Sequence, residues 1–254
     1  MEDLKYGDLD TRMKEYEAVS DIKLTKRTPV ILRFDGCHFH TFTKGFDKPY
    51  DNIMMRTMQR TMRDLCANIQ NCVFGYTQSD EITLVLNDYY TLNVSPWFDN
   101  RVEKMCSVGA SMASRFFNKN FQEVVYEYRS VHAITDEMME LYESRFFTAD
   151  FDCRAFNVPR DEVANCLIWR QQDAEKNSIQ SLAQSLYTHS ELKGISKKDL
   201  QNKMFTEKGV NWNDVPTMFK RGMACKKNEF GKWEIDENIP ILTQDRGYIE
   251  DLVL

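Results

Sequence analysis

What the sequence has little of excludes several classes of protein. Its 254 residues include only 10 glycines and 6 prolines, too few for a collagen-like or low-complexity chain. No apolar run approaches the ~20 residues that a membrane-spanning helix needs, and the polar start MEDLKYGDLDTRMKEYEAV has no signal-peptide core. With 42% hydrophobic residues, the composition indicates a globular enzyme or binding protein, expected in the cytoplasm and not at a membrane.

Cysteine is present, but not in a pattern that carries chemistry. The seven cysteines are scattered and odd in number, and none are spaced as C-x-x-C. Neither a thiolate zinc site nor a disulfide framework is therefore indicated. We expect free thiols in a reducing compartment, most of them buried as small apolar side chains.

The charge is acidic overall and basic in places. A net charge of −6 does not suggest nucleic-acid binding. Basic residues nevertheless cluster within residues 23–27, 197–198 and 220–227. Such clusters are usually solvated surface, and contact with phosphate groups is the alternative.

The first half of the chain predicts alternating strands and helices. Met54, Met58, Met62, Leu65 and Ile69 recur at helical spacing, which is typical of a helix that buries one face. The methionines are better explained as core than as cofactor ligands. The expected elements are, in order, a helix over residues 9–19, a strand Val30–Phe34, a helix over 51–70, a hairpin of strands Cys72–Tyr76 and Glu81–Leu86, a helix over 95–119 and a strand Val124–Tyr128.

The second half is expected to be more helical. Helices are predicted over Asp136–Phe147 and Asp161–Thr188, and a last pair of strands near Trp233–Ile235 and Pro240–Thr243. The order of elements favours an α+β fold, an antiparallel sheet with helices packed on one face. A soft boundary near residue 130 would divide a core of residues 1–130 from a helical part, 131–254, that completes the same globule.

Two short motifs place acids where strands end. Asp35 follows a predicted strand and precedes Gly36, while Asp80 and Glu81 lie in the turn of the predicted hairpin. If the first strand pairs beside that hairpin, the three carboxylates meet at one rim of the sheet and repel unless a cation lies between them. Such oxygen ligands suit Mg²⁺, and two ions ~3.5–4 Å apart are the machinery of nucleotidyl transfer.

A structural explanation competes with the metal site. Asp often caps turns, and either Asp35 or Asp80 taken alone is better explained in that way. Their combination with Arg33 and Ser79 in this topology favours metal binding. Glu81 is the weaker candidate, because side chains alternate along a strand and its own points away from that of Asp80.

The loop after Asp35 offers groups that suit a triphosphate. Residues 36–40 provide consecutive backbone N–H groups, beginning at a glycine whose missing Cβ lets a ligand approach. Lys48 and Arg33 can neutralise phosphate charge, and Ser79 can donate a hydroxyl.

Aromatic and histidine side chains of this loop have competing explanations. One of Phe39, Phe42 and Phe46 is expected to hold a base, although a phenylalanine run more often belongs to a core. His38 and His40 resemble a metal pair without its further ligands. A phosphate contact from His40 is favoured over zinc, and plain packing remains open.

The motifs together resemble a known family. RFDGCHFHTFTKGFDKPYD followed by YTQSDEITLVL is similar to the signature of the tRNA-histidine guanylyltransferase superfamily, and FDCRAFNVP, WRQQDAEKNSIQ, FTEKGVNWNDVPTMFKRG and IPILTQDRGYIEDL continue the likeness over nearly the whole chain. The likeness is greatest to its bacterial-type branch, template-dependent 3′–5′ RNA polymerases that repair the 5′ end of truncated tRNA.

The resemblance implies a fold, cofactors and partners. It implies a catalytic domain similar to the palm of DNA polymerases, two Mg²⁺ ions, ATP, GTP and other nucleoside triphosphates as substrates, tRNA as partner and a homotetramer. Possible G−1 addition to histidine tRNA belongs to the same expectation.

The resemblance also implies roles for particular residues. The metal ligands would be Asp35, the backbone carbonyl of Gly36, and Asp80, with Glu81 as a catalytic neighbour. The nucleotide would be held by Arg33, Gly36, Cys37, His38, Phe39, His40, Phe46, Lys48, Asp51 and Ser79. RNA or triphosphate contacts would come from Arg101, Lys104, Arg154, Arg170 and Asn177.

One departure bears on the activity. Where enzymes that add the extra guanosine carry His-Ile-Asn-Asn, this chain has Glu175-Lys176-Asn177-Ser178. The departure favours templated extension over obligatory G−1 addition. Three alternatives remain: a palm-type cyclase that makes a cyclic signalling nucleotide, a metal-dependent phosphohydrolase, and a non-catalytic RNA-binding module.

Overall fold

The computed structural model describes residues 8–253 and contains one antiparallel sheet in the strand order β4-β1-β3-β2-β5-β6. The chain order β1, α3, β2, β3, α4, β4 repeats a strand–helix–strand unit, and each adjacent pair of strands is antiparallel. The strands are β1 (Val30–Gly36), β2 (Cys72–Gln78), β3 (Glu81–Leu86), β4 (Phe151–Asn157), β5 (Met223–Lys227) and β6 (Trp233–Asp236).

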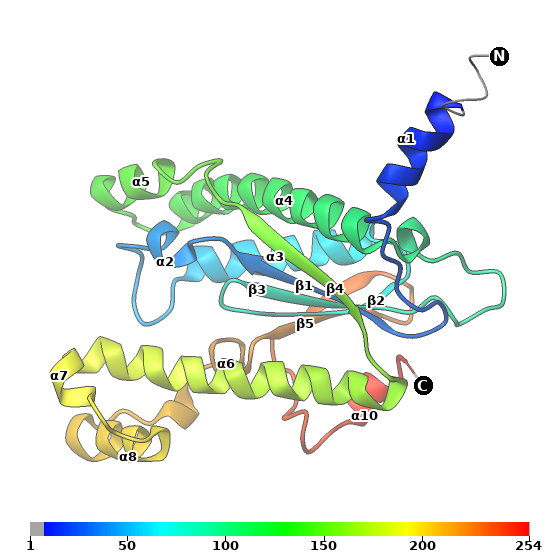
Figure 1. Ribbon diagram of the computed structural model, residues 1–254. Helices are drawn as coiled ribbons and strands as arrows, with labels where there is room; N and C mark the ends of the chain where they lie inside the picture. The colour runs from blue at the N-terminus through cyan, green and yellow to red at the C-terminus, as the bar shows by residue number, and fades with distance from the viewer. Residues whose placement is uncertain (1–7, 254) are drawn as a thin grey trace.

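Helices cover both sides of this sheet, as Figure 1 shows: α3 and α4 lie on one side and α6 on the other. The helices are α1 (Leu9–Ala18), α2 (Phe39–Phe42), α3 (Asn52–Asn68), α4 (Val102–Val131), α5 (Asp136–Glu143), α6 (Val163–Leu186), α7 (His189–Leu192), α8 (Lys197–Lys208), α9 (Thr217–Arg221) and α10 (Gly247–Glu250). Short 3₁₀ turns are η1 (Trp97–Asn100), η2 (Arg160–Glu162) and η3 (Trp212–Asp214).

Alternation along the strands separates two cores. In β1, Leu32 and Phe34 belong to the core under α3 and α4, whereas Ile31 belongs to the core under α6 with Val163 and Leu167. Because successive side chains point to opposite faces, Arg33 and Asp35 also face the side of α6. This side is covered by the more helical C-terminal part of the chain.

The predicted α+β fold is confirmed, and most elements lie where the sequence places them. The expectation that the helices pack on one face is corrected, because α6 covers the face opposite α3 and α4. The helical spacing of residues 54–69 corresponds to α3, in which Met58, Met62 and Leu65 are at most 1% exposed. The sheet takes strands from both sides of residue 130, since β4 pairs with β1. None of the described helices is long and apolar enough to cross a membrane.

The strand predicted over Val124–Tyr128 is wrong, because these residues continue α4. Phe117, Phe121, Val124 and Val125 are at most 1% exposed and repeat at helical spacing. Packing of this stripe outweighs the strand preference of the β-branched residues. The next strand along the chain is instead β4, which the sequence pattern did not predict.

The strand predicted at Pro240–Thr243 is also wrong, and β5 is the partner of β6 instead. The side-chain amide of Gln171 on α6 donates to the Pro240 carbonyl at 2.9 Å and accepts from the Leu242 N–H at 2.8 Å. One buried side chain thus satisfies the backbone groups that a neighbouring strand would otherwise bind.

The cysteines are free thiols, as expected, but fewer are buried than predicted. Cys66, Cys72 and Cys225 are buried, while the other four are partly exposed.

We predict that Gly75→Ala destabilises the fold, because a Cβ at this position of β2 would lie 2.5 Å from the Cys66 Sγ of α3. Overpacking of this kind costs about 1–3 kcal/mol, measurable by urea unfolding. In the double variant with Cys66→Ala, the extra cost of Gly75→Ala should shrink. An equal cost in both backgrounds would show that the contact is not the cause.

Candidate active site

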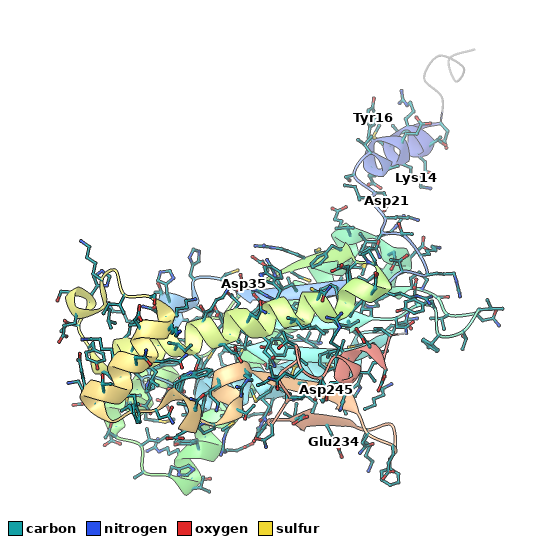
Figure 2. The ribbon with its side chains drawn as sticks, turned by 90° about the horizontal axis from the view of Figure 1, so that it is seen from below. Lys14, Tyr16, Asp21, Asp35, Glu234 and Asp245 are labelled. Carbon is teal, nitrogen blue, oxygen red and sulfur yellow. The ribbon has the colours of Figure 1, made fainter. Side chains whose placement is uncertain are left out.

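The pairing of β1 with β3 brings three carboxylates to one edge of the sheet. Asp35 stands opposite Glu81 in this ladder, and the Gly36 N–H donates to the Asp80 carbonyl at 3.1 Å. Asp80 occupies the short turn that joins β2 to β3, between the paired residues Gln78 and Glu81. Figure 2 labels Asp35 in a view from the side that α6 covers. The acids meet where the sequence predicts.

Among the described residues, Asp35 and Asp80 have no basic side chain as an ion-pair partner. Burial raises the pKa of Asp80, as does the charge of Asp35, while the Ser79 hydroxyl, which donates at 2.9 Å, lowers it. Within residues 8–253 neither carboxylate forms an ion pair with a basic side chain. A divalent cation at this edge would offset the repulsion between the two acids.

The donor set fits Mg²⁺ better than zinc. No group of three or more His, Cys, Asp or Glu side chains in the described part of the chain is arranged to hold a metal. Mg²⁺ commonly takes one or two carboxylates and completes its shell with water and substrate phosphates. The carboxylates of Asp35 and Asp80 and the carbonyl of Gly36 match this preference for oxygen ligands. His38 and His40 are exposed, with ring centroids 6.4 Å apart, and form no such group.

Glu81 differs from the two aspartates because it has a partner. Both of its carboxylate oxygens accept from Nη1 of Arg170, at 2.8 and 3.0 Å. Burial raises the pKa of Glu81, and Arg170 lowers it. Arg170 itself is 5% exposed, so its guanidinium has little surface to offer to RNA.

The predicted run of free N–H groups over residues 36–40 is shorter than expected. The N–H of Gly36 donates to Asp80, and that of Cys37 donates to the Asp150 carbonyl at 2.8 Å, so both are used by the fold. Gly36 is required by packing, because a Cβ there would lie 2.3 Å from the Phe39 ring.

The three phenylalanines of the loop are core residues. Phe39, Phe42 and Phe46 are 4%, 7% and 5% exposed and pack against Phe117 and Phe121 of α4. Phe39 and Phe46 also contribute to the wall of a cavity.

This cavity, of about 480 Å³, lies beside Asp80. It is bounded by the 39–51 loop, the β2–β3 turn, α6 and α9. Its wall combines apolar side chains with many polar and charged ones, and a concave site of this size is typical of small-molecule binding. Of the residues predicted to bind nucleotide or RNA, those that line it are Phe39, His40, Phe46, Lys48, Asp51, Ser79 and Asn177.

Asp51, which lines the cavity, stabilises the loop through hydrogen bonds. Its carboxylate accepts from the N–H groups of Met54 and Asp47, at 2.8 and 3.1 Å, and from the Tyr142 hydroxyl at 2.7 Å. It therefore caps α3 and closes the loop. Burial, and after it the charge of this carboxylate, raises the pKa of Tyr142.

A second set of contacts, which the sequence did not predict, holds the loop of residues 39–51 in place. The Tyr50 hydroxyl lies 2.8 Å from the Ser178 Oγ, which also accepts from the Trp212 indole at 3.1 Å. The Tyr50 ring stacks on Phe219 with centroids 4.7 Å apart. These contacts join segments that are remote in the chain, so the only sequence signal was the aromatic content of the motifs.

The basic residues fall into two groups. Arg33 and Arg154 are cross-strand neighbours on the side of α6, two positions along β1 from Asp35. Arg101 and Lys104 lie at the start of α4. The backbone of Arg101 forms a β-bridge with that of Lys23, and its guanidinium forms an ion pair with Asp21 at 2.9 Å. Figure 1 shows the start of α4 at the opposite end of the sheet from the end of β1 that leads into α2, so one chain does not bring these two residues to its own acidic edge.

Comparison with known proteins agrees with this geometry. A family model described as tRNAHis guanylyltransferase matches residues 10–159. A bacterial tRNA(His) guanylyltransferase-like protein in complex with ATP is 42% identical and covers 97% of this chain and 99% of its own, with a TM-score of 0.86. A bacterial protein of the same description in complex with GTP is 38% identical with a TM-score of 0.79, covering 96% and 98%.

A curated relative extends the likeness beyond bacteria. An uncharacterized protein of Acanthamoeba polyphaga mimivirus is 30% identical over 85% of this chain and 76% of its own length. The palm-like sheet with paired acids at its edge defines a nucleotidyltransferase of the palm class. Within that class, the chain belongs to the tRNAHis guanylyltransferase family.

We predict that Asp80→Asn raises the free energy of unfolding at neutral pH when no divalent cation is present. The raised pKa of Asp80 means that its ionised form is disfavoured in the folded protein. The stability that the protonated acid contributes is lost as pH rises through the folded pKa. The advantage of the neutral variant should therefore be largest near pH 8 and vanish towards about pH 4, measured by thermal unfolding.

Millimolar Mg²⁺ provides the control for this variant. It should raise the melting temperature of the wild type and have little effect on Asp80→Asn. An advantage that is independent of pH would contradict the electrostatic explanation.

Proposed function

We propose that this protein adds nucleotides in the 3′–5′ direction to the 5′ end of tRNA, with the opposite strand as template, and thereby repairs truncated tRNA. The observation that carries the proposal is the cavity beside Asp80, with Lys48, Ser79 and Asn177 in its wall. The ATP and GTP complexes of the two similar bacterial proteins support nucleotide binding in this fold.

The first step activates the end of the RNA. An oxygen of the 5′-monophosphate attacks the α-phosphorus of ATP or GTP, the bond to the β-phosphate breaks, and pyrophosphate leaves. An end that already carries a triphosphate does not need this step. In-line transfer of this kind requires positioning and charge compensation and no nucleophile from the protein.

The second step adds the nucleotide. The 3′-hydroxyl of an incoming nucleoside triphosphate, selected by pairing with the template strand, attacks the activated 5′ phosphate. The bond to the activating nucleotide breaks and AMP or GMP leaves, while the hydroxyl proton passes to solvent. Pairing supplies the sequence choice, so the protein need contact only phosphate and sugar groups.

Residues of this chain divide the work. Asp35, Asp80 and the Gly36 carbonyl would hold two Mg²⁺ ions, which supply Lewis-acid stabilisation of the attacking and leaving oxygens. Lys48 at the cavity and the Arg33–Arg154 pair beside Asp35 offset phosphate charge. The loop of residues 46–51, held through the side chains of Tyr50 and Asp51, orients the nucleotide.

The partner chains are part of the proposal. Arg101 and Lys104 lie at the far end of the sheet from Asp35. A homotetramer would let these basic residues serve RNA bound at another subunit. The Glu175-Lys176-Asn177-Ser178 segment favours templated repair over obligatory G−1 addition.

We predict that Asp35→Ala and Asp80→Ala each abolish both chemical steps while the fold persists. The substrate for this test is a 5′-³²P-labelled tRNA that lacks its first nucleotide, supplied with Mg²⁺ and each nucleoside triphosphate in turn. Wild type should add only the nucleotide that pairs with the template. A cyclic nucleotide formed without RNA would indicate the cyclase alternative, and undiminished addition by Asp80→Ala would contradict the assignment of the metal ligands.

We predict that Arg154→Ala weakens tRNA binding through loss of one phosphate contact. The exposed side chain of Arg154 lies on the side of α6. The slope of log Kd against log salt should fall by about 1. Arg115→Ala is the control, because Arg115 is exposed on α4 across the sheet. Equal slopes for both variants would place Arg154 outside the RNA contact.

A further inference from the structure

Glu81 occupies a position where its charge affects the proposed metal site directly. It stands opposite Asp35 in the β1–β3 ladder, so the two side chains share the side of α6. Directly opposed residues are close neighbours, and like charges there destabilise one another. The site therefore contains carboxylates beyond the two that the cations need: Glu81 opposite Asp35 in the β1–β3 ladder and Asp152 opposite it in the β1–β4 ladder, and of these Glu81 is the one held by a buried cation.

Arg170 of α6 compensates the carboxylate of Glu81. Its Nη1 lies 2.8 and 3.0 Å from the two oxygens of Glu81, and its Nη2 lies 3.1 Å from Asp173. The side chains of Arg170 and Glu81 are only 6% and 11% exposed. The guanidinium carbon lies 3.8 Å from the centre of the Trp169 ring, which fixes the plane of the group.

Burial gives this pair its effect. In a partly desolvated site the attraction between unlike charges is strong, and removal of one partner leaves the other charge uncompensated. Glu81 held by Arg170 adds no net charge beside Asp35. Its carboxylate oxygens face the guanidinium and are withheld from a cation at the sheet edge.

We propose that Arg170 is a positioning residue that acts through Glu81 and thereby reserves Asp35 and Asp80 as the cation ligands. This inference rests on the proposed function. It replaces the prediction that Arg170 touches RNA. It also assigns Glu81 a supporting task that leaves it without contact to the reacting groups.

The test uses Arg170→Gln, Glu81→Gln and the double variant in the full-length chain. Arg170→Gln removes the positive charge that compensates Glu81, so the Mg²⁺ concentration for half-maximal effect should fall. The kcat for nucleotide addition should also fall, about 10- to 100-fold, because the ion is misplaced. Glu81→Gln leaves Arg170 with only the more exposed Asp173 as an acidic partner. The site is then more positive than in the wild type, and the half-maximal Mg²⁺ concentration should rise. The double variant is neutral and should return towards the wild type in both measures.

Opposite shifts of the half-maximal Mg²⁺ concentration in the two single variants, which cancel in the double variant, distinguish this role from a merely structural one. If Arg170 only holds α6 in place, the double variant will remain as impaired as Arg170→Gln, and the proposal is overturned. Shifts of the same sign in both single variants, or no shift, also overturn it. Arg246→Gln is the matched control, because Arg246 binds Glu250 at 2.9 Å and Asn165 of α6 at 2.7 Å, remote from Asp35.

Two readouts keep the inference distinct from the proposed function. Mg²⁺ binding is followed without RNA by the rise in melting temperature, and nucleotide addition is followed with truncated tRNA. A wild type that binds Mg²⁺ and adds no nucleotide would contradict the function and leave the Mg²⁺ comparison decisive for Arg170. A salt slope for tRNA binding that drops by about 1 in Arg170→Gln would restore the RNA-contact reading and refute ours.

Discussion

The antiparallel pairing of β1 with β3 is the constraint on which the site depends. It sets Asp35 opposite Glu81 and brings the Gly36 N–H to the carbonyl of Asp80. A slip of one residue would turn Asp35 towards α3 and α4 and bury a charge in an apolar core. The register is fixed by Leu32 and Phe34 on one side of β1 and Ile31 on the other, all fully buried. Hydrophobic alternation thus positions the acids before any ligand binds.

The local sequence was sufficient to predict the elements whose structure depends on interactions within one segment. The helical spacing of the methionines predicts α3, and the polar turn of residues 77–80 between two largely apolar runs predicts the β2–β3 hairpin. The convergence of Asp35 and Asp80 was predicted only on the condition that the strand Val30–Phe34 pairs beside this hairpin, and the pairing of β1 with β3 fulfils that condition. The residues at Val124 and Val125 show the limit, since their strand preference is outweighed by the Phe117 and Phe121 stripe that α4 buries. Only the tertiary partner decides such a segment.

Contacts between remote segments could not be predicted from either segment. Tyr50, Ser178 and Trp212 meet at one hydroxyl, and no local pattern announces their meeting. The same holds for Gln171, which replaces a strand partner for residues 240–242. Arg170 is the clearest case. A basic residue in a nucleic-acid family motif suggests RNA, whereas its burial against Glu81 gives it an internal partner.

Net charge is a poor guide to what this surface offers an anion. Several basic side chains have partners inside the protein. Arg170 forms an ion pair with Glu81 and Arg221 one with Glu175 at 2.8 Å, while Lys220, 8% exposed, donates to the Asn213 carbonyl. Lys220 and Arg221 belong to the basic cluster of residues 220–227, for which contact with phosphate groups was the alternative to solvated surface. Conversely, Arg33 and Arg154 are far apart in the chain and neighbours in the sheet. Long-range attraction of RNA is screened over about 10 Å in salt. The pair beside Asp35 therefore matters more to a bound phosphate than the total of −6, and an acidic chain can hold RNA where its cations are concentrated.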